Sequence, residues 1–349
     1  MSSALLHRSN RPNSASPNDR NLSQMKWSRE LRIARRSLRT AIKAASSMAS
    51  ATARLPAPMR AVQWPPPAPQ RSSSELSEVT GFGSNPGSLA MFLHVPPVAP
   101  KTGAPLIVLL HGCGQTASRF AADTGWIALA DRLGIPLVLP EQSGENNQGR
   151  CFNWFRPLHV RRGFGEALSI RQMVDTAIAR FGSDPRRVFV AGLSAGGAMA
   201  AALLAAYPDV FAGGAIVAGL PVGAASSATE ALTRMADAEH GRTGDALAQR
   251  VRDAAPERYS GPWPLVSIWH GLADDVVDPA NARLLAEQWS AVHGITNTMN
   301  TTEDDGARRS TWTGSDRPAV ELWMLSDLPH AWPAGAVDRV ARFWGLRPG

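Results

Sequence analysis

Short apolar runs alternate with segments of helical character from about residue 80 onward, and no other property of the sequence limits its fold as strongly. The run Pro105–Leu110 (PLIVLL) is continuously apolar, as expected of a parallel strand buried on both faces. Further strands are expected at Ser88–Val95, Ile135–Leu139, Arg187–Ala191, Ala215–Val217, Leu265–Trp269 and Ala319–Leu325. Helices are expected at Thr116–Leu133, Glu166–Phe181, Gly196–Tyr207 and Val337–Trp344. This alternation predicts an α/β fold, with a mostly parallel central sheet and helices on both faces.

Positive charge is concentrated before this globular part. Residues 1–71 hold 13 Lys and Arg but only two acids, a balance of +11, whereas the remaining residues hold 23 Lys and Arg and 27 acids, a balance of −4. Residues 1–24 are rich in Ser, Asn, Arg and Pro, which predicts disorder. We therefore expect a basic, largely disordered N-terminal arm and Pro/Ser-rich linker over 1–79, followed by one globular domain over 80–349.

Residues 26–46 of the arm have a different pattern. Apolar side chains recur there at three- and four-residue steps, while the arginines lie mostly off that stripe; the stripe consists of Trp27, Leu31, Ala34, Leu38, Ile42 and Ala45. The pattern predicts a basic amphipathic helix that could dock on anionic lipid, a polymer granule or nucleic acid. The alternative is a solvated helix or a charged tail without a partner.

Several kinds of protein are disfavoured by what the sequence lacks. It has no apolar stretch of about 18 residues, so a transmembrane helix is not expected. No signal-peptide core follows the N-terminal charges, because Lys43 interrupts the best apolar candidate. No zinc-type spacing of His or Cys occurs, so neither a metal nor a cofactor is expected. From composition alone, the two cysteines, Cys113 and Cys151, are expected to be free thiols.

The segment Gly192-Leu193-Ser194-Ala195-Gly196 matches G-x-S-x-G. It follows an apolar strand and opens a helix of small residues, which is the context of a nucleophile elbow. The turn is sharp and strained, so the residues beside the serine must be small. Ser194 is therefore the candidate nucleophile, and the alternative is a glycine-rich packing turn.

A serine hydroxyl needs a histidine as base and a carboxylate that orients the histidine, in the chain order Ser, Asp/Glu, His. His330 is the candidate base, because it follows the strand Ala319–Leu325, at the sheet edge where ligands bind. Asp274, the first acid after the strand Leu265–Trp269, is the candidate orienter, and Asp275 and Asp278 are its rivals. His270 is expected to make a structural hydrogen bond instead of acting as the base.

Acyl transfer also needs two backbone N–H groups that bind the developing oxyanion. Ala195, directly after the nucleophile, supplies the first. The turn His111-Gly112-Cys113-Gly114, after the strand Pro105–Leu110, supplies the second, which we assign to Cys113 with Gly114 as the alternative. His111 is expected to organise this loop by a hydrogen bond.

Six motifs occur in one order: HGCGQT at 111–116, PEQ at 140–142, RCFNWF at 150–155, GLSAGGAMA at 192–200, HGLADDVVDPAN at 270–281 and PHAW at 329–332. With them the chain resembles esterases of the polyhydroxybutyrate (PHB) depolymerase family, over about residues 80–346. It is more distantly similar to feruloyl and acetylxylan esterases. The resemblance implies an α/β-hydrolase fold, a Ser194–Asp274–His330 triad and pairing of Cys113 with Cys151. It also suggests that Trp154 and Phe155 line the substrate groove, although both could be ordinary core aromatics.

These expectations describe a serine esterase that acts on poly(3-hydroxybutyrate) or its oligomers, without a cofactor and with no specific nucleic acid partner. Two features distinguish this chain from the secreted polymer-degrading members of the family. They are the basic arm and a chain that stops just after its last helix. They favour a cytoplasmic enzyme that docks on polymer granules, and an extracellular enzyme is the alternative. The alternatives are a feruloyl or acetylxylan type of carbohydrate esterase, and a granule- or membrane-binding protein with a silent hydrolase domain.

Overall fold

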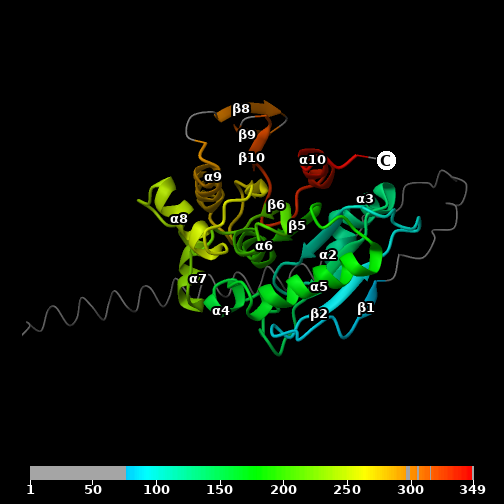
Figure 1. The fold of residues 1–349 in the computed structure, drawn as a ribbon. Coiled ribbons are helices and arrows are strands. Elements are labelled where there is room, and N and C mark those ends of the chain that lie inside the picture. The colour runs from blue at the N-terminus through cyan, green and yellow to red at the C-terminus, as the bar shows by residue number, and fades with distance from the viewer. Residues whose placement is uncertain (1–75, 296–298, 305, 315, 348–349) are drawn as a thin grey trace, which may run out of the picture.

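A computed structural model describes residues 76–295, 299–304, 306–314 and 316–347 (Figure 1). The predicted arm helix at 26–46 and the linker at 55–75 lie outside these residues. The described chain forms one sheet with the strand order β1-β2-β4-β3-β5-β6-β7-β10-β9-β8. The strands are β1 (Ser77–Val79), β2 (Ala90–His94), β3 (Leu106–Leu110), β4 (Leu137–Glu141), β5 (Val188–Leu193), β6 (Phe211–Val217), β7 (Leu265–Gly271), β8 (Met299–Asp304), β9 (Ala307–Thr313) and β10 (Pro318–Leu325).

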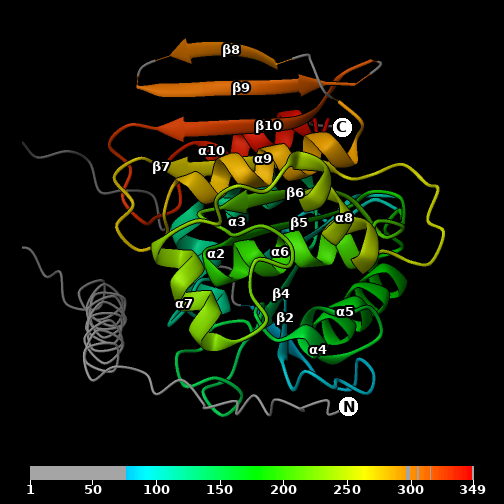
Figure 2. The same ribbon diagram turned by 90° about the vertical axis from the view of Figure 1, so that its left-hand side faces the viewer.

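The centre of the sheet is parallel and its two edges are antiparallel. From β4 through β3, β5, β6 and β7 to β10, each strand pairs in parallel with its neighbour. At one edge β1 and β2 run antiparallel, and at the other β9 and β8 do, as Figure 2 shows for β8, β9 and β10. The carboxyl ends of the central strands therefore meet at one edge, where ligands bind in open α/β sheets.

Helices cover both faces of the sheet, because the central strands are apolar on both sides. They are α2 (Ala117–Thr124), α3 (Trp126–Leu133), α4 (Pro157–Val160), α5 (Gly165–Phe181), α6 (Ala195–Ala206), α7 (Ala228–Ala236), α8 (Gly244–Ala254), α9 (Ala280–Val292) and α10 (Ala336–Phe343). The helices α5, α6, α8 and α9 bury their apolar sides on one face, and α2, α3 and α10 on the other (Figure 1). On β3, Val108 faces the first core and Ile107 the second. The predicted α/β fold with helices on both faces is confirmed.

The structure differs from the predicted elements in two ways. The single helix expected over 116–133 is two helices, because Gly125 between them has a left-handed φ of 85°. The antiparallel strands β8 and β9, and the helices α4, α7 and α8, were not expected from the sequence. Nor was β1, which joins the sheet at Ser77–Val79, just before the expected start of the globular domain at 80. None of the helices in the described residues is long and apolar enough to cross a membrane.

Candidate active site

Ser194 lies in the sharp turn between β5 and α6. Its φ of 58° and ψ of −119° are strained values for a residue with a side chain. The N–H of Ser194 donates to the carbonyl of Val217 at 2.8 Å, and its own carbonyl accepts from the N–H of Ala198 at 2.9 Å. The turn is thus fixed to β6 on one side and to α6 on the other. It holds the serine at the carboxyl end of β5.

Gly196 allows this turn to pack directly against the end of β3. A Cβ atom at position 196 would lie 2.2 Å from the carbonyl oxygen of Leu110 and 2.6 Å from that of His111. Both contacts are with backbone, which cannot move aside easily. The glycine therefore brings the first turn of α6 next to the loop that begins at His111.

Asp274 and His330, which follow different strands, meet at the same edge of the sheet. Nδ1 of His330 lies 2.7 Å from Oδ2 of Asp274. The side chain of Asp274 is almost fully buried, whereas that of His330 keeps 15% of its surface exposed. Oδ1 of Asp274 accepts the N–H groups of Val276 and Val277, both at 2.9 Å, which fixes the carboxylate plane.

His270 is a second histidine on the same carboxylate. Its Nε2 lies 3.1 Å from Oδ2 of Asp274 and 3.0 Å from the carbonyl oxygen of Val277. Both are acceptors, so Nε2 of His270 carries the proton, and this residue makes the structural contact expected of it. Burial opposes ionisation of Asp274, but the hydrogen bonds from His270 and His330 outweigh it and hold the pKa of Asp274 well below its usual value.

Gly271 explains why the loop of His330 reaches Asp274. A Cβ atom at position 271 would lie 1.8 Å from the carbonyl oxygen of Leu328. Only a glycine at the end of β7 lets the segment before His330 come so close. The two rivals of Asp274 are placed differently. Asp275 is exposed, and Asp278 accepts the N–H groups of Ala238 and Ala280, the latter in the first turn of α9.

Ser194 and His330 share the carboxyl edge of the sheet, since one follows β5 and the other follows β10. Among the described residues, the hydroxyl of Ser194 makes no hydrogen bond to His330. Hydrogen bonds between nucleophile and base are often loose before substrate binds. Pairing of these two residues therefore stays a prediction, whereas the contact of His330 with Asp274 is part of the structure.

The turn after β3 leaves one N–H group for an oxyanion. The N–H of Gly112 donates to Oε1 of Gln115 at 2.8 Å, and that of Gly114 donates to the carbonyl of Gly149 at 2.8 Å. Within the described ranges, the N–H groups of Cys113 and Ala195 have no partner in the protein. Ala195 also begins α6, where the helix dipole favours negative charge. These two groups suit the predicted oxyanion site, and Gly114 does not.

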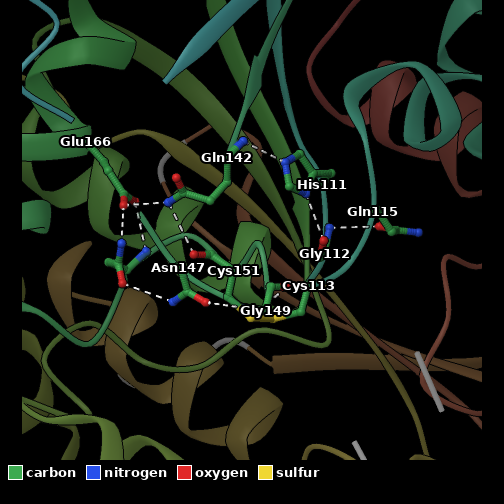
Figure 3. Close-up of a disulfide and its surroundings, with 10 residues drawn as sticks. His111, Gly112, Cys113, Gln115, Gln142, Asn147, Gly149, Cys151 and Glu166 are labelled. Carbon is green, nitrogen blue, oxygen red and sulfur yellow. Dashed lines mark hydrogen bonds between the residues drawn. A yellow bond between two sulfur atoms is a disulfide. The ribbon is translucent and has the colours of Figure 1, made fainter. Parts of the chain in front are cut away.

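A disulfide joins Cys113 to Cys151 (Figure 3). The expectation of free thiols, which rested on composition, is therefore wrong, because composition cannot report that two cysteines 38 residues apart in the sequence meet in the fold. The pairing that the family resemblance implied is confirmed. The bond connects the turn after β3 to the loop after β4. Nδ1 of His111 bonds the carbonyl of Gly112 at 2.8 Å, so this histidine also organises the turn, as predicted.

The buried carboxylate of Glu166, at the start of α5, binds the loop that follows β4 (Figure 3). It accepts Nε2 of Gln142 at 2.7 Å, Nδ2 of Asn153 at 2.6 Å and the N–H of Asn153 at 2.8 Å. The N–H of Gln142 in turn donates to Nε2 of His111 at 3.1 Å. From the sequence, Glu166 is expected only to begin a helix. The motifs PEQ and RCFNWF, which contain its partners, were the available signal.

Trp154 and Phe155 pack against each other with their ring centroids 5.7 Å apart. Trp154 is buried in the core on the α5 and α6 face of the sheet, and Phe155 is partly buried against that core. Both side chains therefore serve as core aromatics, and a role in a substrate groove stays a prediction.

Residues 89–316 match the family described as Esterase PHB depolymerase. Poly(3-hydroxyalkanoate) depolymerase C from Paucimonas lemoignei is 43% identical over 260 residues, which are 74% of this chain and 62% of the relative. The chain thus spans less than two thirds of that relative. Acetylxylan esterase from Coprinopsis cinerea is 34% identical over 289 residues, 80% of this chain and 76% of the relative.

Two further similar proteins are also named as esterases. Feruloyl esterase B from Neurospora crassa is 35% identical over 278 residues, 78% of this chain and 93% of the relative. Among solved structures, an acetyl xylan esterase from Aspergillus awamori is similar with a TM-score of 0.71 and 24% identity, over 78% of this chain and 100% of that one. This structural likeness supports the fold alone.

Proposed function

Because the chain belongs to the esterase PHB depolymerase family, we propose that it is a serine esterase that hydrolyses carboxylic esters. Ser194 is the nucleophile, His330 the general base and Asp274 the residue that orients His330. The observation that carries this proposal is the 2.7 Å contact between His330 and Asp274, at the sheet edge where Ser194 is held in its strained turn.

In the proposed reaction, His330 carries each proton that is transferred. Asp274 accepts a hydrogen bond from the Nδ1–H group of His330, which leaves Nε2 free to take the proton of the Ser194 hydroxyl. Ser194 attacks the ester carbonyl, and the oxyanion is bound by the N–H groups of Cys113 and Ala195. His330 then protonates the departing alcohol. Water attacks the acyl-enzyme as His330 takes one of its protons, and His330 then gives that proton to the oxygen of Ser194 as the acid leaves.

The substrate that we propose is poly(3-hydroxybutyrate) or its oligomers. The support is that the depolymerase from Paucimonas lemoignei is 43% identical, against 34% and 35% for the carbohydrate esterases named above. Acetyl or feruloyl esters of polysaccharides are the second candidate, because those relatives match a larger share of their own length. A silent hydrolase domain is disfavoured, since Asp274 and His330 are already in contact.

The proposal is tested with a short p-nitrophenyl ester. Ser194→Ala and His330→Ala should each lower kcat by roughly 10⁴-fold or more, because the members of a triad act as a unit. His240→Ala, at an exposed histidine bonded only to Asp237, is the matched control. Activity within about tenfold of wild type in either variant would remove that residue from the mechanism.

The substrate class is decided separately. Hydroxybutyrate oligomers, polymer granules, acetylated xylan and feruloylated sugar are compared by kcat/KM with the same preparation. A preference for the polyester substrates supports a depolymerase. A preference for either sugar ester assigns the chain to the carbohydrate esterases while leaving the triad in place.

A further inference from the structure

A cavity of about 610 Å³ between β9, β10 and α10 is lined by an unusual number of arginines. Five arginines line it: Arg309, Arg317, Arg339, Arg342 and Arg347. They come from β9, from the turn before β10, from α10 and from the segment after α10. The only acid in the lining is Glu321. This excess of positive charge stands out in a globular part whose overall balance, from residue 72 on, is −4.

The one acid in the cavity is already neutralised. Oε2 of Glu321 accepts Nε of Arg309 at 2.9 Å and Nη2 at 2.8 Å, and its other oxygen accepts the hydroxyl of Ser267 at 2.6 Å. Glu321 is almost completely buried. A nearby acid outside the lining, Asp338, is paired with Arg132 on α3. Among the described residues, no acid pairs with the other four arginines of the cavity.

Trp323 holds part of this arginine group in a fixed position. The guanidinium of Arg339 lies 4.6 Å from the centroid of its ring, and that of Arg309 lies 5.4 Å away. Trp323 is itself buried and stacks on Trp269, with the ring centroids 4.7 Å apart and the planes within 7°. Cation–π contacts on a rigid ring order the guanidinium groups before any ligand binds.

From these contacts we propose that the cavity binds a phosphate group. Four arginines line the same cavity without an acidic partner among the described residues, and an anion bound there would balance their charge. A phosphate carries nearly two negative charges and three strong acceptor oxygens, and guanidinium binds such oxygens in pairs. A single carboxylate offers one charge and two oxygens, which fewer arginines would satisfy. The phosphate can belong to a soluble phosphate monoester or to a phospholipid that ends in a phosphomonoester, such as phosphatidic acid.

The cavity is separate from the proposed esterase site. Its residues do not include Ser194, Asp274 or His330, and it extends along β10 from the strand's amino end at Pro318, whereas His330 follows the carboxyl end. Phosphate binding can therefore be tested without any ester substrate.

Modification of the full chain by phenylglyoxal, followed by peptide mass spectrometry, measures the exposure of each arginine. With inorganic phosphate at ten times its Kd, labelling of Arg317, Arg342 and Arg347 should slow by about tenfold. Arg186 and Arg258, which are exposed on other parts of the surface, should be labelled at an unchanged rate. Sodium chloride at equal ionic strength shows how much of any effect is screening.

A substitution then tests whether these arginines share one ligand. Arg342→Gln should abolish most of the protection of Arg317 and Arg347, whereas Arg258→Gln, with the same change in net charge, should not. Arg317→Gln is the second variant, with the protection of Arg342 as its readout, if the first lowers the Tm.

The two sources of phosphate are separated by vesicles of phosphatidic acid in phosphatidylcholine, compared with phosphatidylcholine alone. Protection by the anionic vesicles but not by free phosphate assigns the site to a headgroup, and protection by free phosphate assigns it to a soluble ligand. Equal protection of cavity and control arginines, or protection by acetate as strong as by phosphate, overturns the proposal.

Discussion

Asp274 is the residue on which most of the candidate site converges. One of its oxygens accepts two backbone N–H groups, and the other faces the rings of His270 and His330. In Asp274→Asn an amide N–H₂ would face one or both histidine N–H groups. We expect kcat to fall by about 10³- to 10⁴-fold, somewhat less than for Ser194→Ala, because His330 loses its correct tautomer while the oxyanion site survives.

The same assay on Asp275→Asn and Asp278→Asn controls for this prediction. Asp275 is exposed, and Asp278 binds only backbone N–H groups at the start of α9 and beside it, so both should retain most of the activity. If one of these two neighbours gives the largest fall in kcat, Asp274 is not the orienting residue.

His111 gives a prediction about stability and pH. Burial lowers its pKa below the ordinary value, although the bond to the Gly112 carbonyl partly opposes this. The neutral ring is the form that accepts the N–H of Gln142 through Nε2. Below about pH 6.5 the unfolded chain gains a proton at this residue that the folded protein resists, so His111 should make the protein less stable as the pH falls.

The measurement is the free energy of unfolding between about pH 8 and pH 5, where histidine titrates. His111→Gln keeps an acceptor but cannot titrate, so its stability should depend less steeply on pH than that of the wild type. His240→Gln, at an exposed site, is the control. An equal slope in the wild type and in His111→Gln would show that protonation of His111 does not oppose folding.

At the level of elements, the disulfide ties the oxyanion turn after β3 to the loop after β4. Cys151→Ser breaks this tie but keeps Cys113 and its N–H group. For a separation of 38 residues, the loss of the bond should cost about 4 kcal/mol of stability in the chain-entropy model. We also expect a lower kcat at temperatures where the variant is folded, because the N–H of Cys113 is held less well in the position of the oxyanion donor.

A reductant provides the control for the disulfide. Reduced wild type should match Cys151→Ser in Tm and in kcat, and the variant should not respond to the reductant. A lower Tm with an unchanged kcat would mean that the disulfide stabilises the fold without holding the oxyanion turn.

The elements that could be predicted well from the sequence are those with a strong local pattern of residues. The central strands are continuous apolar runs. Ser194 lies in a motif in which glycine is required for steric reasons, because a Cβ atom at position 196 would clash with the backbone of Leu110. The strand β8 (MNTTED) is polar and lies at an edge, so its pairing with β9 comes from tertiary contact and not from its own pattern. Glu166 was missed for a similar reason, because its burial depends on Gln142 and Asn153, which lie in other segments.

For the whole molecule, two features bear on the compartment and favour different answers. The predicted granule-docking arm suits the cytoplasm. The disulfide between Cys113 and Cys151 suits an oxidising compartment, because cytosolic thiols are kept reduced. A cytoplasmic location therefore stays a prediction, with an extracellular one as its alternative. The redox state of the two cysteines, in protein isolated from cells under thiol-trapping conditions, distinguishes the two locations.

The arm itself supplies the last prediction. Residues 1–71 carry a balance of +11, and the stripe that contains Trp27, Leu31, Leu38 and Ile42 would give a helix there one apolar side. We propose that this segment docks the enzyme on a hydrophobic surface with an anionic coat, such as a storage granule: the stripe inserts and the arginines add an attraction that salt weakens. Deletion of residues 1–75 should leave hydrolysis of a small soluble ester nearly unchanged, because Cys113, Ser194, Asp274 and His330 all lie within the described fold.

Cosedimentation with isolated granules should then decrease by about tenfold or more, because the insertion of the apolar stripe and the attraction of the arginines are lost together. In the full chain, replacing Arg32, Arg35, Arg36 and Arg39 by Gln removes charge but keeps the apolar stripe, and should reproduce only the part of the loss that raised salt also produces. If the truncated protein cosediments as well as the intact one, the arm is not the anchor. Any granule binding that remains and that Arg342→Gln weakens would then belong to the arginine-lined cavity beside α10.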